Sequence, residues 1–269
     1  MEVIFVAGKT EINYYATNGV TITYMEDPYP VQNKLGEQKL VVIFQSLGDE
    51  KSDDPAKRFP YTLIDGLKFY NCRKIYVKDS EGLVGTYYLG LNGKLDIKEA
   101  VIEFLKNKIK EYKISPENLI MFGFSKGGYA ALMFGFELGA GHIITAVPQF
   151  DLTSWIYKYK PHLTYILPNN PSDEDKKFYK NYLKNTILQS EHRPDVYLIT
   201  SKNDNTHDDH IPQLLETLAM KNITPYVYYN NNDFVTRHNN VVINSMNEIL
   251  TILGMLLCDE KVRSFWSNR

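Results

Sequence analysis

The chain contains little cysteine: its 269 residues include two, Cys72 and Cys258, which lie far apart in the sequence. Its first residues, MEVIFVAGKTE, also lack the basic region, the long apolar core and the small-residue cleavage site of a secretory signal peptide. Disulfide bonds form and persist mainly in exported proteins. We therefore expect two buried thiols without a disulfide, in a cytoplasmic protein.

The sequence also lacks long apolar runs and an excess of either charge. No stretch of about 18 apolar residues occurs, so we expect no membrane span. The formal net charge of -2 and the pI near 6.3 provide no basic surface for nucleic acid. With 43% hydrophobic and 23% charged residues, the chain is typical of a globular protein. Its length favours one domain over residues 1–269 with a sizeable core.

Short apolar runs alternate with amphipathic ones along most of the chain. Strands are expected at 1–7, 11–17 and 20–25, with Asn18-Gly19 as a hairpin turn between the last two. Further strands are expected at 39–45, 73–78, 119–122, 142–147, 195–201 and 224–229, and helices at 97–112, after residue 125, at 211–220 and at 241–257. This alternation predicts an α/β fold: a mostly parallel sheet with helices on both faces and antiparallel N-terminal strands.

Residues 151–193 interrupt that alternation with several prolines, a charged run and five tyrosines. We interpret this segment as a cap-like insertion over the carboxyl-terminal edge of the sheet. Its aromatic rings could stack on sugar rings or anchor a partner. With 20 tyrosines in the chain, the clustering is equally well explained as ordinary packing.

The most informative stretch is NLIMFGFSKGGYAA, at residues 118–131. A buried strand leads into Gly123-Phe124-Ser125-Lys126-Gly127, a match to G-x-S-x-G, and a helix follows. A serine raised at the tip of a strained turn needs neighbours without a Cβ atom, which the two glycines provide. The pattern predicts Ser125 as a nucleophile, with the backbone N–H of Lys126 facing the oxyanion. We expect the Lys126 side chain to be solvated.

A serine nucleophile of this type needs an acid and a histidine, which follow it in that order. Asp204 comes just after the strand at 195–201, and His238 follows the strand at 224–229. We predict Asp204 as the acid and His238 as the base, with Asp208 as the main rival acid. Pro148-Gln149, at another strand end, could line the acyl or leaving-group pocket.

The run Thr206-His207-Asp208-Asp209-His210 contains ligand types that bind zinc or iron. Its spacing matches no common metal site, and a solvated loop with Asp208 and Asp209 as helix caps explains it. We therefore expect no metal and no cofactor.

From residue 39 to 257 the chain resembles the α/β-hydrolase superfamily. That resemblance implies Ser125 as nucleophile, His238 as general base and Asp204 as the residue that orients the imidazole. It also implies an oxyanion hole made by the Lys126 N–H and an N–H from Gln45 or Ser46. Here the chain has Gln45-Ser46-Leu47-Gly48, where many esterases carry a His-Gly-rich loop.

A narrower likeness comes from KIYVKD at 74–79, from residues 123–132 and from AVPQ at 146–149. These look like hydrolase-fold proteins of bacterial surface-polysaccharide and accessory-secretion systems. The likeness implies an esterase or O-acetyltransferase acting on a carbohydrate or another small ester. Among partners we expect a small-molecule or glycan ester substrate, and we consider a homo-oligomer or a secretion or polysaccharide-assembly partner as further candidates.

Three classes of function remain open at this point. The first is a serine esterase or acyltransferase that forms an acyl-enzyme on Ser125. A peptidase or thioesterase would use the same triad. The third is a hydrolase-fold binding or assembly protein without activity, since a fold does not fix a function.

Overall fold

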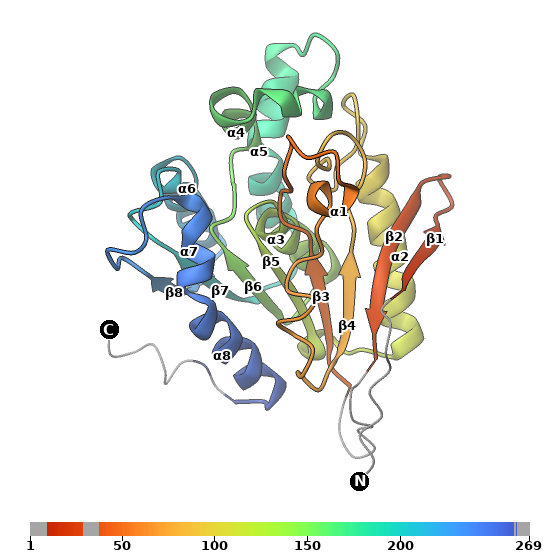
Figure 1. The fold of residues 1–269 in the computed structure, drawn as a ribbon, viewed down its shortest axis with the longest axis vertical. Helices are drawn as coiled ribbons and strands as arrows, with labels where there is room; N and C mark the ends of the chain where they lie inside the picture. Colours follow the sequence, from red (N-terminus) through yellow and green to blue (C-terminus); the bar gives the residue numbers. More distant parts are fainter. Residues whose placement is uncertain (1–9, 29–37, 261, 263–269) are drawn as a thin grey trace.

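The computed structural model of the chain describes residues 10–28, 38–260 and 262. In these residues one sheet runs in the order β1-β2-β4-β3-β5-β6-β7-β8 (Figure 1). The strands are β1 (Glu11–Tyr15), β2 (Thr21–Asp27), β3 (Leu40–Phe44), β4 (Arg73–Val77), β5 (Leu119–Phe124), β6 (His142–Ala146), β7 (Asp195–Thr200) and β8 (Tyr226–Tyr229). The strand expected at 1–7 lies outside the described residues.

The sheet is antiparallel at its N-terminal edge and parallel elsewhere, as the sequence predicts. β1 pairs with β2, and β2 with β4, in antiparallel register, whereas the pairs from β4 to β8 are parallel. The β1–β2 turn is closed by a hydrogen bond from Ala16 N–H to Val20 O (2.9 Å). Gly19 takes the positive φ of 85° that this turn requires.

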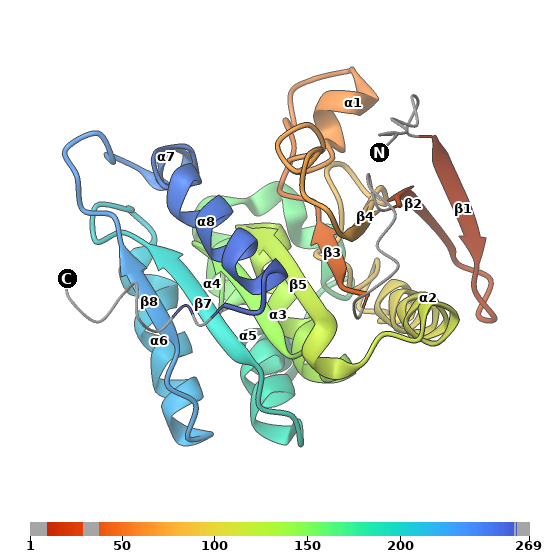
Figure 2. The ribbon, with the colours of Figure 1, turned by 90° about the horizontal axis from the view of Figure 1, so that it is seen from below.

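Helices cover both faces of the sheet, which accounts for the continuous apolar runs of the parallel strands. Side chains alternate along each strand, so that Val42 of β3 joins the core on one face and Val41 the core on the other. Figure 2 shows the two layers. One face carries α2 (Asp96–Tyr112), α3 (Lys126–Leu138), α5 (Asp173–Gln189) and α6 (His207–Met220); the other carries α7 (His238–Asn244) and α8 (Met246–Leu257).

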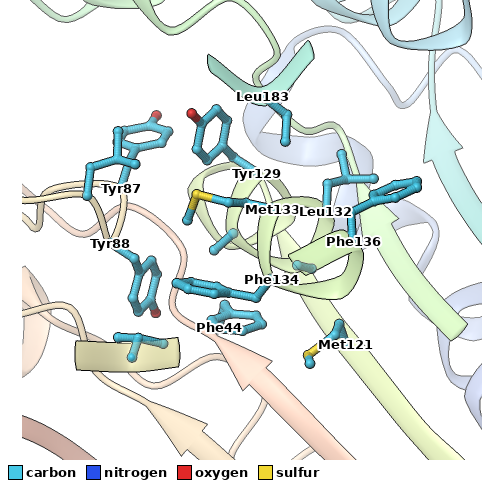
Figure 3. Close-up of a cluster of buried hydrophobic side chains, with 14 of the residues drawn as sticks. Phe44, Tyr87, Tyr88, Met121, Tyr129, Leu132, Met133, Phe134, Phe136 and Leu183 are labelled. Atoms are coloured by element: carbon cyan, nitrogen blue, oxygen red, sulfur yellow. The ribbon is translucent and has the colours of Figure 1, made fainter. Parts of the chain in front are cut away.

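Aromatic side chains fill the core on the α3 face (Figure 3). The Phe44 ring stacks on Phe134 with 5.2 Å between ring centroids, and Tyr88 meets Phe44 edge-on. Tyr87 meets the Tyr129 ring of α3 at a centroid distance of 5.5 Å. Tyr87 and Tyr88 thereby fix the segment after β4 against the helix that begins at the predicted nucleophile.

The segment 151–193 has two parts with different roles. α4 (Leu152–Tyr159) and the 3-10 helix η2 (Pro161–Ile166) lie beyond the carboxyl ends of the strands (Figure 1). In contrast, α5 packs against α3 and α6 as the crossover helix between β6 and β7. Two remaining short helices are α1 (Pro55–Arg58) and η1 (Pro116–Asn118).

The helix expected at 241–257 is in fact two helices, α7 and α8, bent by 55° at Ser245. The Asn230 side-chain amide donates to Asn244 O (2.9 Å) and to Ser245 Oγ (3.0 Å). These bonds satisfy the Asn244 carbonyl and the Ser245 hydroxyl where the helix is interrupted. The apolar periodicity of the sequence does not reveal this interruption. Within the described ranges no single helix has the length and apolar character to cross a membrane; only this bent pair does, by length and composition alone.

Both cysteines are free, as expected, but only one is buried. Cys72 lies in the core, and burial raises the pKa of its thiol to about 12. Cys258 is exposed at the end of α8, so the expectation of two buried thiols was wrong for this residue.

Candidate active site

Ser125 sits at a strained turn between β5 and α3. It has φ 50° and ψ -117°, and its N–H donates to Ala146 O of β6 (2.9 Å). A Cβ atom on Gly123 would collide with the Gly127 carbonyl, and one on Gly127 with the Phe44 carbonyl of β3. The glycines therefore allow the close approach of strand and helix that the sequence motif predicts.

The structure brings the three residues predicted for the triad together. The imidazole Nε2 atom of His238 lies 2.9 Å from Ser125 Oγ, and its Nδ1 atom lies 2.9 Å from Asp204 Oδ2. Asp204 lies in the loop after β7, and His238 is the first residue of α7 rather than part of a loop. The spacing between these side chains matches a nucleophile, a base and an orienting acid.

Asp204 is held as a carboxylate. Burial alone would raise its pKa, but hydrogen bonds from His238 and Thr206 and the attraction to His238 hold the pKa below its ordinary value. Its Oδ1 atom accepts from the Thr206 N–H (2.8 Å) and from Thr206 Oγ1 (2.8 Å). Thr206 is a residue that the sequence reasoning missed, because a threonine before a helix is equally typical of a cap.

The rival acid Asp208 contacts His207, whereas Asp204 contacts His238. The Asp208 side chain is almost fully exposed and pairs with the neighbouring His207, while Asp209 binds Lys158 and Tyr159 instead of capping a helix. These positions leave Asp204 as the acid in contact with His238.

The sequence predicts a solvated loop for the 206–210 run, and this prediction was wrong for its two histidines. Both are buried in the first turn of α6. His210 Nδ1 accepts a hydrogen bond from the Phe150 N–H (3.3 Å), and burial lowers the pKa of His210 to about 4. Among the described residues no group of three or more His, Cys, Asp or Glu side chains is arranged to hold a metal ion.

The expectation that the Lys126 side chain is solvated was wrong. The side chain is fully buried, and its Nζ atom lies 3.0 Å from Asp79 Oδ2. The same carboxylate accepts from the backbone N–H groups of Thr86 (2.8 Å) and Tyr88 (3.2 Å). Burial lowers the pKa of Lys126, although Asp79 acts against this shift. Asp79 follows β4, so the pair spans the end of the intervening strand β3, a contact that residue spacing cannot reveal.

The candidate oxyanion donors differ in whether they are available. The Lys126 N–H has no hydrogen-bond partner within the described part of the chain. The Gln45 N–H donates to Tyr88 Oη (2.6 Å), and the Ser46 N–H donates to Thr62 Oγ1 (3.0 Å). In the same loop the Leu47 N–H makes no such bond to any described residue.

A cavity of about 650 Å³ opens beside Ser125 and His238. Val147, Trp155 and Val242 form part of an apolar wall, and Leu47 and Lys51 come from the loop after β3. Lys160, after α4, binds Glu50 of that loop at 3.2 Å. The chain segment after β6 therefore meets the loop after β3 at this cavity, which has the size of a small-molecule site.

Comparison with solved structures gives a consistent picture of the architecture. The capsule O-acetyltransferase of Neisseria meningitidis serogroup A superposes with a TM-score of 0.73 at 19% identity, over 94% of this chain and 96% of that one. The fluorophosphonate-binding serine hydrolase FphF of Staphylococcus aureus gives a TM-score of 0.63 at 14% identity, over 93% and 98% of the two chains. The chain has the α/β-hydrolase fold.

A further structure with this α/β-hydrolase fold is the Glycosylation Associate Protein (Gap123) complex from Streptococcus agalactiae. It gives a TM-score of 0.73 at 16% identity, over 90% of this chain and 45% of that chain. No protein-family model matches the sequence, and no curated protein matches it either. The likeness is therefore one of fold.

In this α/β-hydrolase fold, one further side chain touches the serine. Gln149 is fully buried, and its Nε2 atom lies 3.0 Å from Ser125 Oγ and 3.3 Å from His238 Nε2. The sequence placed Gln149 only as a possible pocket residue. In the structure Gln149 contacts the nucleophile itself. The chain turns sharply just before it, at Val147, where φ is 42°.

Proposed function

We propose that the protein is a serine hydrolase or acyltransferase that forms an acyl-enzyme on Ser125. The observation that supports this most strongly is the continuous series of contacts from Ser125 Oγ through the His238 imidazole to Asp204, with 2.9 Å at each step. In acylation, His238 Nε2 takes the Ser125 proton while Oγ attacks the carbonyl carbon. Asp204 holds the imidazole by its Nδ1 atom and stabilises the imidazolium that forms.

The tetrahedral intermediate then needs donors for its oxyanion. We propose the Lys126 N–H, which lies at the start of α3, where the helix dipole also favours negative charge. We expected the second donor at Gln45 or Ser46, whose N–H groups are engaged with Tyr88 and Thr62. Leu47 lines the cavity and its N–H makes no hydrogen bond to a described residue, so we propose this N–H as the second donor.

Collapse of this intermediate returns the proton from His238 to the leaving group and leaves the acyl group on Ser125 Oγ. A second hydroxyl, from water or from a sugar, then gives its proton to His238 and takes the acyl group. We propose an ester or acetyl group on a carbohydrate, or another small ester, as the substrate class. The structural likeness to the capsule O-acetyltransferase, a mutant of which is described in complex with CoA, supports acetyl transfer as the reaction.

Two alternative functions are compatible with the same site geometry. A peptidase or thioesterase would use the same nucleophile, and a dipeptidyl peptidase 4 from Porphyromonas gingivalis is among the structures with this fold (TM-score 0.65, 13% identity). A non-catalytic assembly role would fit the likeness to the Gap123 complex. The cytoplasmic location, a homo-oligomer and a partner from polysaccharide assembly or secretion stay predictions from the sequence.

The test is covalent labelling with a fluorophosphonate probe, followed by peptide mapping. The probe should label Ser125 in the native protein and leave a folded Ser125→Ala variant unlabelled. Labelling that persists in Ser125→Ala would refute the nucleophile, and no labelling of the native protein would favour the assembly role. A panel of p-nitrophenyl esters, acyl-CoA thioesters and peptides then separates esterase, transferase and peptidase activities.

A further inference from the structure

Gln149 lies at the end of an unusual backbone turn. β6 ends at Ala146, and the next residue, Val147, has a φ of 42°, which a β-branched side chain rarely adopts. The Val147 N–H is fixed by a hydrogen bond to Ile199 O of β7 (2.9 Å). Such strained residues persist only where surrounding structure holds them, and they concentrate at functional sites. The turn carries the Gln149 side chain to the nucleophile.

The other end of the Gln149 amide is held by a second strained residue. Tyr87, with a φ of 58°, donates a hydrogen bond from its hydroxyl to Gln149 Oε1 (3.2 Å). Its ring is fully buried against Tyr129 (Figure 3), and its neighbours Thr86 and Tyr88 are bound by the Asp79 carboxylate. Burial raises the pKa of Tyr87 well above its ordinary value, so that its hydroxyl stays a donor.

This anchoring decides which end of the amide faces the reacting groups. Ser125 Oγ lies 3.2 Å from Oε1 and 3.0 Å from Nε2 of Gln149, so distance alone does not orient the amide. Because Oε1 accepts from Tyr87, the Nε2 hydrogens are directed to Ser125 and His238. An amide provides a donor here without adding a charge beside the imidazole.

The strand order places Gln149 on one particular side of Ser125. β5, which leads to Ser125, lies between β3 and β6. The loop with the proposed oxyanion donors follows β3, whereas Gln149 follows β6, on the side of β5 that also holds β7, β8 and the following His238. In acyl transfer, the oxygen on the histidine side belongs to the leaving group or to the acceptor, since its proton passes through His238 Nε2.

We propose that Gln149 is a catalytic residue that hydrogen-bonds the acceptor oxygen during deacylation. This inference rests on the proposed acyl-enzyme. The acceptor O–H gives its proton to His238 Nε2 as its oxygen bonds to the acyl carbon, while the Gln149 Nε2–H holds that oxygen in line. The bond from the acyl carbon to Ser125 Oγ then breaks, and Oγ recovers the proton from His238.

The test separates the two half-reactions with leaving groups that need no hydrogen bond. Fluorophosphonate labelling and the initial burst with p-nitrophenyl acetate report attack by Ser125, because fluoride and p-nitrophenolate leave unaided. Decay of the trapped acetyl-Ser125, followed by mass spectrometry with water as acceptor, reports deacylation. The variants are Gln149→Ala, Gln149→Met, which keeps the volume without a donor, and Tyr87→Phe. The exposed Gln189→Ala is the matched control.

We expect Gln149→Ala and Gln149→Met to slow deacylation about tenfold more than they change the rate of Ser125 labelling, a difference equivalent to the loss of one hydrogen bond. Tyr87→Phe, a positioning variant, should show the same split with a smaller loss. The inference is overturned if labelling and deacylation fall by the same factor, if neither changes, or if only Gln149→Ala is slow, which would indicate space filling. Failure of the native protein to label would instead refute the acyl-enzyme itself.

Discussion

Loss of the Asp79 carboxylate should destabilise the fold far more than loss of a surface charge. Lys126 Nζ is fully buried; it lies 3.0 Å from Asp79 Oδ2, 3.2 Å from Val84 O and 5.4 Å from the centroid of the Tyr88 ring. In Asp79→Asn the buried ammonium group loses its charged partner and keeps neutral contacts such as the Val84 carbonyl and the Tyr88 ring. Breaking a buried ion pair costs about 3–5 kcal/mol, so we expect Asp79→Asn to lower the unfolding free energy by about 4 kcal/mol at pH 7.

The reverse variant, Lys126→Met, should cost less, at about 3 kcal/mol. The remaining Asp79 carboxylate still accepts from Thr86 N–H, Thr86 Oγ1 and Tyr88 N–H, which stabilise its charge. The double variant should be more stable than Asp79→Asn alone, because it leaves no buried charge. Urea unfolding followed by circular dichroism gives all three values.

The cost of Asp79→Asn should also depend on pH in a defined direction. Burial lowers the pKa of Lys126, and removal of Asp79 takes away the contact that raises it. In the unfolded chain the pKa of a lysine is about 10.4. At pH values between the lowered pKa of folded Lys126 and about 10.4, the unfolded chain therefore binds more protons than the folded one. The stability of the variant should therefore rise with pH in this window, and its deficit should shrink from pH 7 towards about pH 10.

The control for this prediction is the surface pair between the exposed Lys158 and the half-buried Asp209, with 2.7 Å between charged atoms. Lys158→Met should leave the unfolding free energy nearly unchanged, since solvent screens such pairs. The reasoning fails if Asp79→Asn costs no more than Lys158→Met, or if its deficit grows as the pH rises.

Three further predictions concern the site and its support. Asp204→Asn should reduce turnover by about 10⁴, whereas Asp208→Ala should keep turnover and melting temperature, as paired rate and melting measurements will show. His210 has a pKa of about 4 in the fold. An unfolded histidine has a pKa of about 6.5, so the unfolded chain binds more protons between these two values. The unfolding free energy should therefore fall by roughly 3 kcal/mol as the pH is lowered from about 6.5 to about 4, and urea unfolding should show a smaller fall in His210→Gln. Gly127→Ala should destabilise the turn and abolish labelling of Ser125, because its Cβ would meet Phe44 O at 2.5 Å.

The parts of the fold that the sequence predicts well are those written in local patterns. The Asn18-Gly19 turn, the apolar runs of the parallel strands and the glycines around Ser125 each reflect a steric requirement of a few adjacent residues. Asp204 and His238 follow strand ends whose order in the sheet is constrained, so their approach to Ser125 could be anticipated.

The parts that it misses depend on contacts between distant segments. Lys126 looks like a solvated lysine until Asp79 is brought across the end of β3, and no periodicity reveals that pair. Gln149 is close to Ser125 because Val147 turns the chain, a backbone feature without a sequence signature. The bend between α7 and α8 likewise depends on Asn230, outside the helical run.

The most direct test of the central claim measures whether Ser125, His238 and Asp204 act as one unit. The rate of fluorophosphonate labelling at Ser125 is compared in the native protein, in His238→Gln, in Asp204→Asn and in the double variant. We predict a loss of about 10⁴ or more for His238→Gln, with little further loss in the double variant, because Asp204 acts only through the imidazole. Losses that multiply independently, or a His238→Gln protein that labels at the native rate, would contradict the triad.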